Sequence, residues 1–287
     1  MTDSYTAAEC DGLPIIVADA PDFDPETLRG LPYVIYAMDC DDVGAKMVAI
    51  LEKYGVPFYA ARLTPLGITA KYYHIRQNVR ECLRIEHDDD TADKMFHFNE
   101  PDFMNIAQAI DITKNVQGAY VEVGTFNGAS ARFALRHMEQ NNVARHCYFM
   151  DVFTGFDYAT AKDSPDTRWA GSHNSHGYEV VKGRLKKFES DRLKVCVRKN
   201  NIIEDDFPDD IGPIAVANLD VDMLEAVRAG LQVLSHRIVS GGILIVEDPG
   251  HTPTLIGARV ALNEFLKDDE SFMPIYMESG QTYLIKK

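Results

Sequence analysis

The sequence predicts an α/β fold with a mostly parallel sheet, a reversed C-terminal edge strand, and a small βαβ-like unit at its N-terminal side. Three observations lead to this fold class. Short apolar runs alternate with helix-period stretches after residue 119, a glycine-containing turn follows the first of these runs, and a glycine-joined hairpin ends the chain. Alternation of strands and helices implies parallel strands covered by helices on both faces.

The N-terminal third predicts a separate accessory unit. Residues 1–30 are rich in Asp and Pro and are expected to form an irregular arm. A strand over 31–38, an apolar helical stripe over 41–54 and a second strand over 56–61 form the βαβ-like unit. The turn after its first strand holds carboxylates and no glycine, so we expect no cofactor site there.

The acidic run that starts at Glu86 is expected to be a solvated connector. We therefore predict two domains, with residues 1–98 as the arm and accessory unit and residues 99–287 as the main domain.

The main domain is expected to begin with a helix over 102–113 and to continue as alternating strands and helices. Its strands are predicted at 119–123, 146–151, 193–198, 214–219 and 242–247. A helix over 253–267 precedes two short strands joined by the turn that starts at Glu278, which predicts a hairpin with a reversed edge strand.

Composition and charge narrow the class of partner. The chain has 287 residues, of which 46 % are hydrophobic, and a net charge of −15, which disfavours nucleic acid because such binding depends on Lys and Arg. The five scattered cysteines form no metal-binding spacing, which favours reduced thiols in the cytoplasm. No leader-like segment or long apolar run indicates secretion or membrane insertion. The partner we expect is a small molecule, and we expect a homo-oligomer, first of all a dimer.

The most informative stretch runs from Ala119 to Ser130, where a short strand meets a glycine turn and a helix begins. Such a turn places backbone N–H groups and the positive end of the helix dipole beside a ligand. The alternative is a structural strand–turn–helix. The spacing Glu-x-Gly-x-x-x-Gly differs from the dinucleotide motif Gly-x-Gly-x-x-Gly and resembles the first motif of S-adenosylmethionine (SAM) methyltransferases. The predicted cofactor-binding residues here are Glu122, Gly124, Thr125, Phe126, Asn127, Gly128 and Ser130.

Polar residues that end the next two strands extend this predicted site. Asp151 closes the second strand, where a carboxylate can accept hydrogen bonds from both ribose hydroxyls; the alternative is a turn or helix cap. Asn200 and Asn201 follow the third strand and are predicted to face the adenine end, with an ordinary polar loop as the alternative.

Carboxylates close the fourth and fifth strands and carry most of the expected chemistry. Asp220 and Asp222 end one strand, and Glu247 and Asp248 end the next. Carboxylates this close are unfavourable unless a cation binds them or one is protonated, and their oxygens suit Mg²⁺. We predict Asp220, Glu247 and Asp248 as metal ligands; the alternative is that these residues are caps or turn residues.

Catalytic roles are predicted for Asp220, Asp222 and His251, with Asp222 or His251 as the base that removes the acceptor proton. For His251 the alternative is an ordinary hydrogen-bonded polar residue. The polar segment from Asp163 to Tyr178, which holds Trp169, is expected to be a lid or binding loop; the alternative is a surface loop held by one buried aromatic ring.

As a set, these motifs resemble the macrocin O-methyltransferase (TylF-like) family. The similar segments are Glu122–Gly128, Asp151–Phe156, Leu219–Asp222 and Glu247–Gly250, with the helix that starts at Gly257. The resemblance covers roughly residues 100–287. It implies the Rossmann-like sheet of class I SAM-dependent methyltransferases, with SAM as cofactor and dependence on a divalent metal.

The implied reaction is Mg²⁺-assisted methylation of a hydroxyl on a sugar or another diol-bearing natural product. Glu247 departs from the family's usual pair of aspartates, which puts metal dependence in question, and the N-terminal unit lies outside the resemblance, so a different acceptor is expected. Two alternatives stay open: a metal-dependent catechol-type O-methyltransferase and a catalytically silent SAM-binding module.

Overall fold

The computed structural model divides the chain into two compact units, residues 1–76 and 77–287. The boundary between the two units lies earlier than the domain boundary expected after residue 98. The division into domains at residue 98 stays a prediction. The residues described are 9–10, 13–14, 24, 26, 34–38, 49, 51–53, 55–56, 58–64, 67–71, 76–93, 99–158, 161, 164, 166–250 and 256–287.

The first unit contains a three-stranded sheet. Strands β3 (Val34–Met38) and β4 (Phe58–Thr64) pair in parallel, as expected for a βαβ-like unit, and β5 (Gly67–Lys71) adds to β4 in the antiparallel direction. Most of the expected helix over 41–54 lies outside the described residues. The N-terminal arm includes two short paired strands, β1 (Glu9–Cys10) and β2 (Leu13–Pro14).

The second unit is a seven-stranded sheet, and the predicted fold class is confirmed. Its strands are β6 (Ala119–Val123), β7 (Arg145–Asp151), β8 (Leu193–Lys199), β9 (Ile214–Leu219), β10 (Ile238–Val246), β11 (Phe272–Tyr276) and β12 (Thr282–Lys286). Their order is β11-β12-β10-β9-β6-β7-β8. The strands from β10 to β8 are parallel, and the reversed strand is β12, which lies between β10 and β11.

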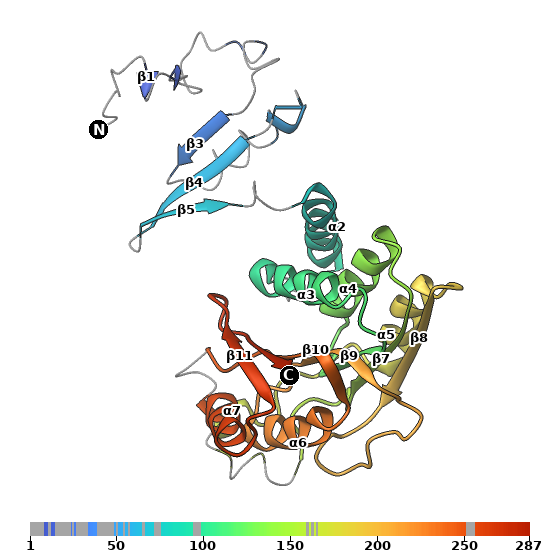
Figure 1. Ribbon diagram of the computed structural model, residues 1–287. Coiled ribbons are helices and arrows are strands. Elements are labelled where there is room, and N and C mark those ends of the chain that lie inside the picture. The colour runs from blue at the N-terminus through green and yellow to red at the C-terminus, as the bar shows by residue number, and fades with distance from the viewer. Residues whose placement is uncertain are drawn as a thin grey trace. The chain divides into compact units, whose positions relative to one another are not determined.

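Helices cover both faces of this sheet (Figure 1). One face carries α3 (Glu100–Ile112), α4 (Ala129–Gln140) and α5 (Tyr178–Leu185), and the other carries α6 (Leu224–Ser235) and α7 (Ile256–Asp268). The central strands β6 and β9 are buried along their whole length, so they read as continuous apolar runs rather than as alternating ones.

The predicted connector around Glu86 is wrong, because residues 77–93 form helix α2 (Gln77–Asp93). Val79, Cys82 and Leu83 supply its buried face. Glu86 is fully buried, and Arg132 of α4 donates to it from Nε over 2.8 Å. This ion pair compensates the buried charge of Glu86, while His87 and Asp88 of the same run are exposed.

The sheet reverses its strand order between β6 and β9, and this places a site there. The chain runs outward from β6 to β7 and β8 on one side, then returns to β9 and continues to β10 on the other. In such sheets ligands bind beyond the carboxyl ends of the strands at this point.

Among the helices of the described residues, none combines the length and the apolar character that crossing a bilayer requires.

Candidate active site

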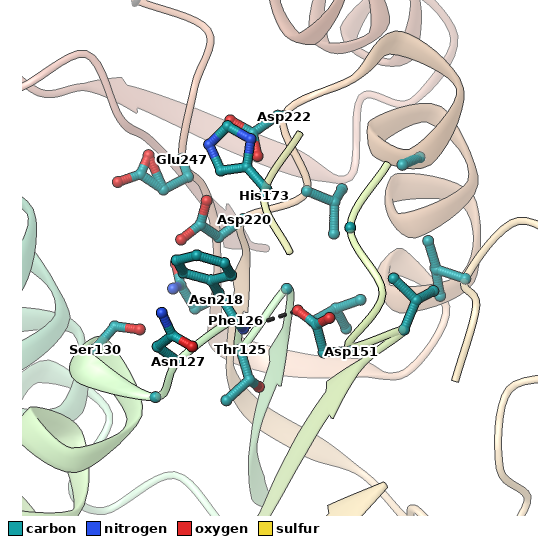
Figure 2. Close-up of a pocket in the computed structure, with 18 of the residues that line it drawn as sticks. Thr125, Phe126, Asn127, Ser130, Asp151, His173, Asn218, Asp220, Asp222 and Glu247 are labelled. Carbon is teal, nitrogen blue, oxygen red and sulfur yellow. Dashed lines mark hydrogen bonds between the residues drawn. The ribbon is translucent and has the colours of Figure 1, made fainter. Parts of the chain in front are cut away.

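A pocket opens at the carboxyl ends of β6, β7, β9 and β10, at the switch point of the sheet (Figure 2). Nearly all the predicted cofactor-binding residues lie in its wall. They are Gly124, Thr125, Phe126, Asn127, Gly128, Ser130, Asp151, Asn200 and Asn201. Asp220, Asp222 and Glu247 line the same pocket, so the two halves of the predicted site share one cavity.

Gly124 brings the end of β6 against the end of β9. Its φ is +95°, and a Cβ at this position would lie 1.6 Å from the carbonyl oxygen of Asp220. The backbone N–H of Asp220 donates to the carbonyl of Val123 over 2.9 Å, which completes the contact. Only glycine fits here, because the obstacle is backbone rather than a movable side chain.

The turn then leads directly into α4. Gly128 has a φ of +84°, and α4 begins at the next residue without a side-chain cap from Gly128. Gly128, Ala129 and Ser130 all line the pocket, so the positive end of the helix faces the cavity. This arrangement suits an anionic or strongly polar ligand group.

Glu122 lies behind the pocket wall. It is fully buried, and the hydroxyls of Ser130 and Tyr120 each donate to its carboxylate over 3.1 Å. Burial raises the pKa of Glu122 from its ordinary value of 4.5 to about 7, although the two hydroxyls oppose the shift. Ser130, which donates to Glu122, lines the cavity, whereas Glu122 itself does not.

Asp151 ends β7 and organises the turns on either side of it. Its carboxylate accepts a hydrogen bond from the backbone N–H of Phe126 over 2.8 Å (Figure 2). It accepts a second one from the backbone N–H of Phe153 over 2.5 Å. Burial raises the pKa of Asp151, and the two N–H donors oppose this shift. Asp151 therefore stabilises the glycine turn, and its carboxylate oxygens can still accept further hydrogen bonds from a ligand in the pocket.

Three carboxylates converge at the ends of β9 and β10. Asp220, Asp222 and Asp248 each place an oxygen so that the three oxygens lie within 4.8 Å of one another. The backbone N–H of Asp222 donates to Asp248 over 3.1 Å, and Asp222 has a φ of +58°. Burial and the charges of Asp248 and Asp222 raise the pKa of Asp220 well above its usual range.

Glu247 lies close to these three carboxylates, and its role as a metal ligand stays a prediction. It lines the pocket, but the convergent triad contains Asp222 in its stead. Burial, followed by the charges of Asp220, Asp248 and Asp102, raises the pKa of Glu247 well above its ordinary value. His251, the other predicted catalytic residue, lies outside the described residues.

The pocket wall includes residues that the sequence analysis did not assign to the site, among them Asp102, Asn218 and His173. Asp102 of α3 is buried beside Glu247, and nothing in its helix distinguishes it from an ordinary first-turn carboxylate. Asn218 lies opposite Glu122 in the sheet. A polar residue in the otherwise apolar strand β9 is a feature of the sequence that could have indicated a site residue. His173 comes from the predicted binding loop but was not assigned to the site.

His173 lies in a group of aromatic rings. Its ring centroid is 4.8 Å from Phe156, 5.5 Å from Trp169 and 5.9 Å from Phe126. Burial lowers the pKa of His173, and the charge of Asp248 opposes that shift. The loop therefore brings an imidazole into the same pocket as the carboxylates.

The sheet order, the glycine turn and the acidic strand ends define a class I SAM-dependent methyltransferase. The family model for macrocin-O-methyltransferase (TylF) matches residues 94–277. The chain belongs to the macrocin O-methyltransferase family, as its motifs predicted, and is a SAM-dependent methyltransferase.

Solved structures share this fold. The O-methyltransferase NovP matches with a TM-score of 0.58 at 20 % identity, over 66 % of this chain and 81 % of that one. The calicheamicin methyltransferase CalS11 matches with a TM-score of 0.54 at 16 % identity, over 73 % of this chain and 91 % of that one. No curated protein matches the sequence.

Proposed function

We propose that the protein is a Mg²⁺-assisted O-methyltransferase that methylates a hydroxyl of a sugar or another diol-bearing natural product. The observation that carries the proposal is the convergence of Asp220, Asp222 and Asp248 beside the glycine turn. Membership in a family named for a macrolide methyltransferase supports a natural-product acceptor, as does the name of CalS11.

Residues of the first half of the pocket are proposed to bind SAM. The turn from Gly124 to Gly128 leaves room for close approach, and the end of α4 faces the cavity. Asp151, which lines the pocket, is proposed to accept hydrogen bonds from the ribose hydroxyls, and Asn200 and Asn201, at the end of the neighbouring strand, are proposed to face the adenine end. When bound, SAM supplies the reactive methyl group.

Residues of the second half fit a hard divalent cation. The oxygens of Asp220, Asp222 and Asp248 are the ligand type that Mg²⁺ prefers, and their spacing allows them to share one ion. When bound, the cation lowers the pKa of a coordinated hydroxyl. Glu247, a predicted ligand, is proposed as a further one, since it lines the same pocket.

The protein contributes orientation and a base. Pocket walls that hold both reactants in line account for roughly 7–11 kcal/mol of barrier lowering, and a positioned base adds about 10²–10⁴-fold. Asp222 is the described residue proposed as base, because it lines the pocket next to Asp220. His251 stays a prediction for the same role.

The SAM site is tested by titrating S-adenosylhomocysteine (SAH) into the protein in a calorimeter. Asp151→Asn is expected to weaken binding roughly 10- to 100-fold, because a hydrogen bond to a charged group contributes about 1.5–3 kcal/mol. Asp157→Asn is the matched control, since Asp157 is exposed in the following segment. Unchanged affinity in the Asp151 variant would refute the ribose assignment.

The metal requirement is tested in methyl-transfer assays with panels of sugar diols and of simple catechols. Excess EDTA and Asp220→Asn should each abolish turnover, while SAH binding persists. Full turnover in EDTA would rule out the metal's role. Turnover of catechols alone would favour the catechol-type alternative, and no turnover with any diol would favour a silent SAM-binding module.

A further inference from the structure

The described residues 152–158, 161, 164 and 166–177, here called the 152–177 segment, contact the helices behind the carboxylates through the side chain of Asp166. Asp166 is 1 % exposed. Its Oδ2 accepts from the backbone N–H of Leu224 and its Oδ1 from that of Gly257, each over 3.1 Å. One carboxylate thus caps the first turn of α6 and the first turn of α7 together.

The junction has no room for a larger residue at position 257. A Cβ on Gly257 would lie 1.9 Å from Oδ2 of Asp166 and 2.6 Å from Cβ of Leu224. The start of α6 has no local cap: its N-cap residue is Met223, whose side chain makes no capping hydrogen bond. Asp166 therefore supplies from a distant segment what the α6 sequence lacks locally.

The two helices held by Asp166 follow the strand ends that carry the acidic triad. Asp220 and Asp222 lie just before α6, and Asp248 lies between β10 and α7. Asp166 therefore fixes the 152–177 segment relative to both halves of the triad.

The other end of the segment forms part of the pocket wall. The backbone N–H of Phe156 donates to Ser172 and that of Gly171 to Phe156, each over 3.0 Å, so the segment is folded back on itself. His173 follows directly, with a φ of +59°, and its ring packs against Trp169, three residues after Asp166. The position of His173 thus depends on the docking of the same short stretch.

We propose that Asp166 is a positioning residue that docks the 152–177 segment on α6 and α7 and thereby holds His173 in the acceptor half of the pocket. The acceptor half is the side of the pocket that holds Asp220, Asp222 and Asp248, and its assignment to the acceptor rests on the proposed function. The proposed SAM-binding side of the pocket depends less on Asp166, because Gly124 donates to the carbonyl of Met150 and Phe126 donates to Asp151, both outside the segment. The segment reaches that side through the backbone N–H groups of Phe153 and His176, which donate to Asp151 and to Oδ1 of Asn127.

Trp169 is the only tryptophan in the chain and reports on this docking directly. We would measure its emission and its quenching by acrylamide in Asp166→Asn, Asp166→Ala and Gly257→Ala. Asp157→Asn and Gly183→Ala are matched controls, because Asp157 is exposed in the same segment and a Cβ on Gly183 meets no atom within 4 Å. SAH titration and a urea unfolding curve accompany each variant.

Losing hydrogen bonds to a buried carboxylate is expected to shift the ratio of undocked to docked segment roughly 10- to 100-fold. Quenching of Trp169 should rise in the order wild type, Asp166→Asn, Asp166→Ala, and should also rise in Gly257→Ala. SAH affinity should change by a much smaller factor than the docking ratio in these folded variants, and it should stay unchanged in both controls.

Unchanged Trp169 quenching in all three variants would overturn the inference. A loss of SAH affinity by as large a factor as the change in docking would also overturn it, because that result indicates a general structural role for Asp166. The proposed function is judged separately. Failure of the wild-type protein to bind SAH would overturn that function, while the fluorescence comparison still decides whether Asp166 docks the segment.

Discussion

Replacing Gly124 with alanine tests whether the site needs direct backbone contact between β6 and β9. The added Cβ would lie 1.6 Å from the carbonyl oxygen of Asp220 and 2.5 Å from its carbonyl carbon. A φ of +95° is a conformation that alanine rarely adopts. Since no rotamer change relieves a clash with backbone, the two strand ends must move apart.

Two contributions set the expected loss of stability: the clash of the added Cβ with the backbone of Asp220, and the strain of a positive φ at an alanine. Overpacking costs typically about 1–3 kcal/mol, and a strained backbone conformation costs a further 1–3 kcal/mol or so. We expect the free energy of unfolding to fall by roughly 2–6 kcal/mol, with Tm falling by about 2–4 °C for each kcal/mol. SAH affinity should fall at least about tenfold, because the turn and Asp220 shift together.

The assays are urea unfolding followed by circular dichroism and calorimetric titration of SAH. Gly183→Ala is the control, because Gly183 lies in α5 with open space around it. Alanine there should raise stability by up to about 1 kcal/mol and leave SAH affinity unchanged. A Gly124→Ala protein with wild-type stability and wild-type SAH affinity would refute the reasoning.

Two further predictions concern stability. Arg132→Met should lower the free energy of unfolding by about 3–5 kcal/mol, since it strands the buried charge of Glu86, whereas Arg228→Met at the half-exposed pair with Glu264 should cost at most about 1 kcal/mol in the same urea assay. Because burial raises the pKa of Glu122 from 4.5 to about 7, the folded protein keeps a proton that the unfolded chain has released between these values. The contribution of Glu122 to stability should therefore fall, by up to about 3 kcal/mol, as pH rises from 4.5 to 7. Unfolding curves across this pH range should show a shallower fall for Glu122→Gln, and an identical slope would contradict this prediction.

The sequence predicts the strands of the main sheet closely, because buried parallel strands are short β-branched runs bounded by turns. The run at 119–123 and the run at 214–219 match β6 and β9 residue for residue. Their end residues meet at one edge for a topological reason, so Asp151 and Asp220 could be placed in one pocket before the structure was known.

The parts that escaped prediction depend on contacts between distant residues. Glu86 looks solvated until its partner Arg132 is placed beside it. Asp222 meets Asp220 and Asp248 from a backbone with positive φ, a conformation that Asp adopts more readily than most residues but that the pattern of the sequence does not reveal. Asp102 reaches the pocket because of how α3 packs, which periodicity alone does not fix.

The return of the chain to β9 also bears on how the protein is made. A nascent chain that has not reached residue 214 already holds the glycine turn and Asp151, yet one edge of β6 lacks its neighbour. Parallel pairing between segments so far apart is slow, because a long loop must close before the contacts form. We therefore expect the binding site to be completed late in folding, with the open edge of β6 prone to wrong pairing until β9 inserts.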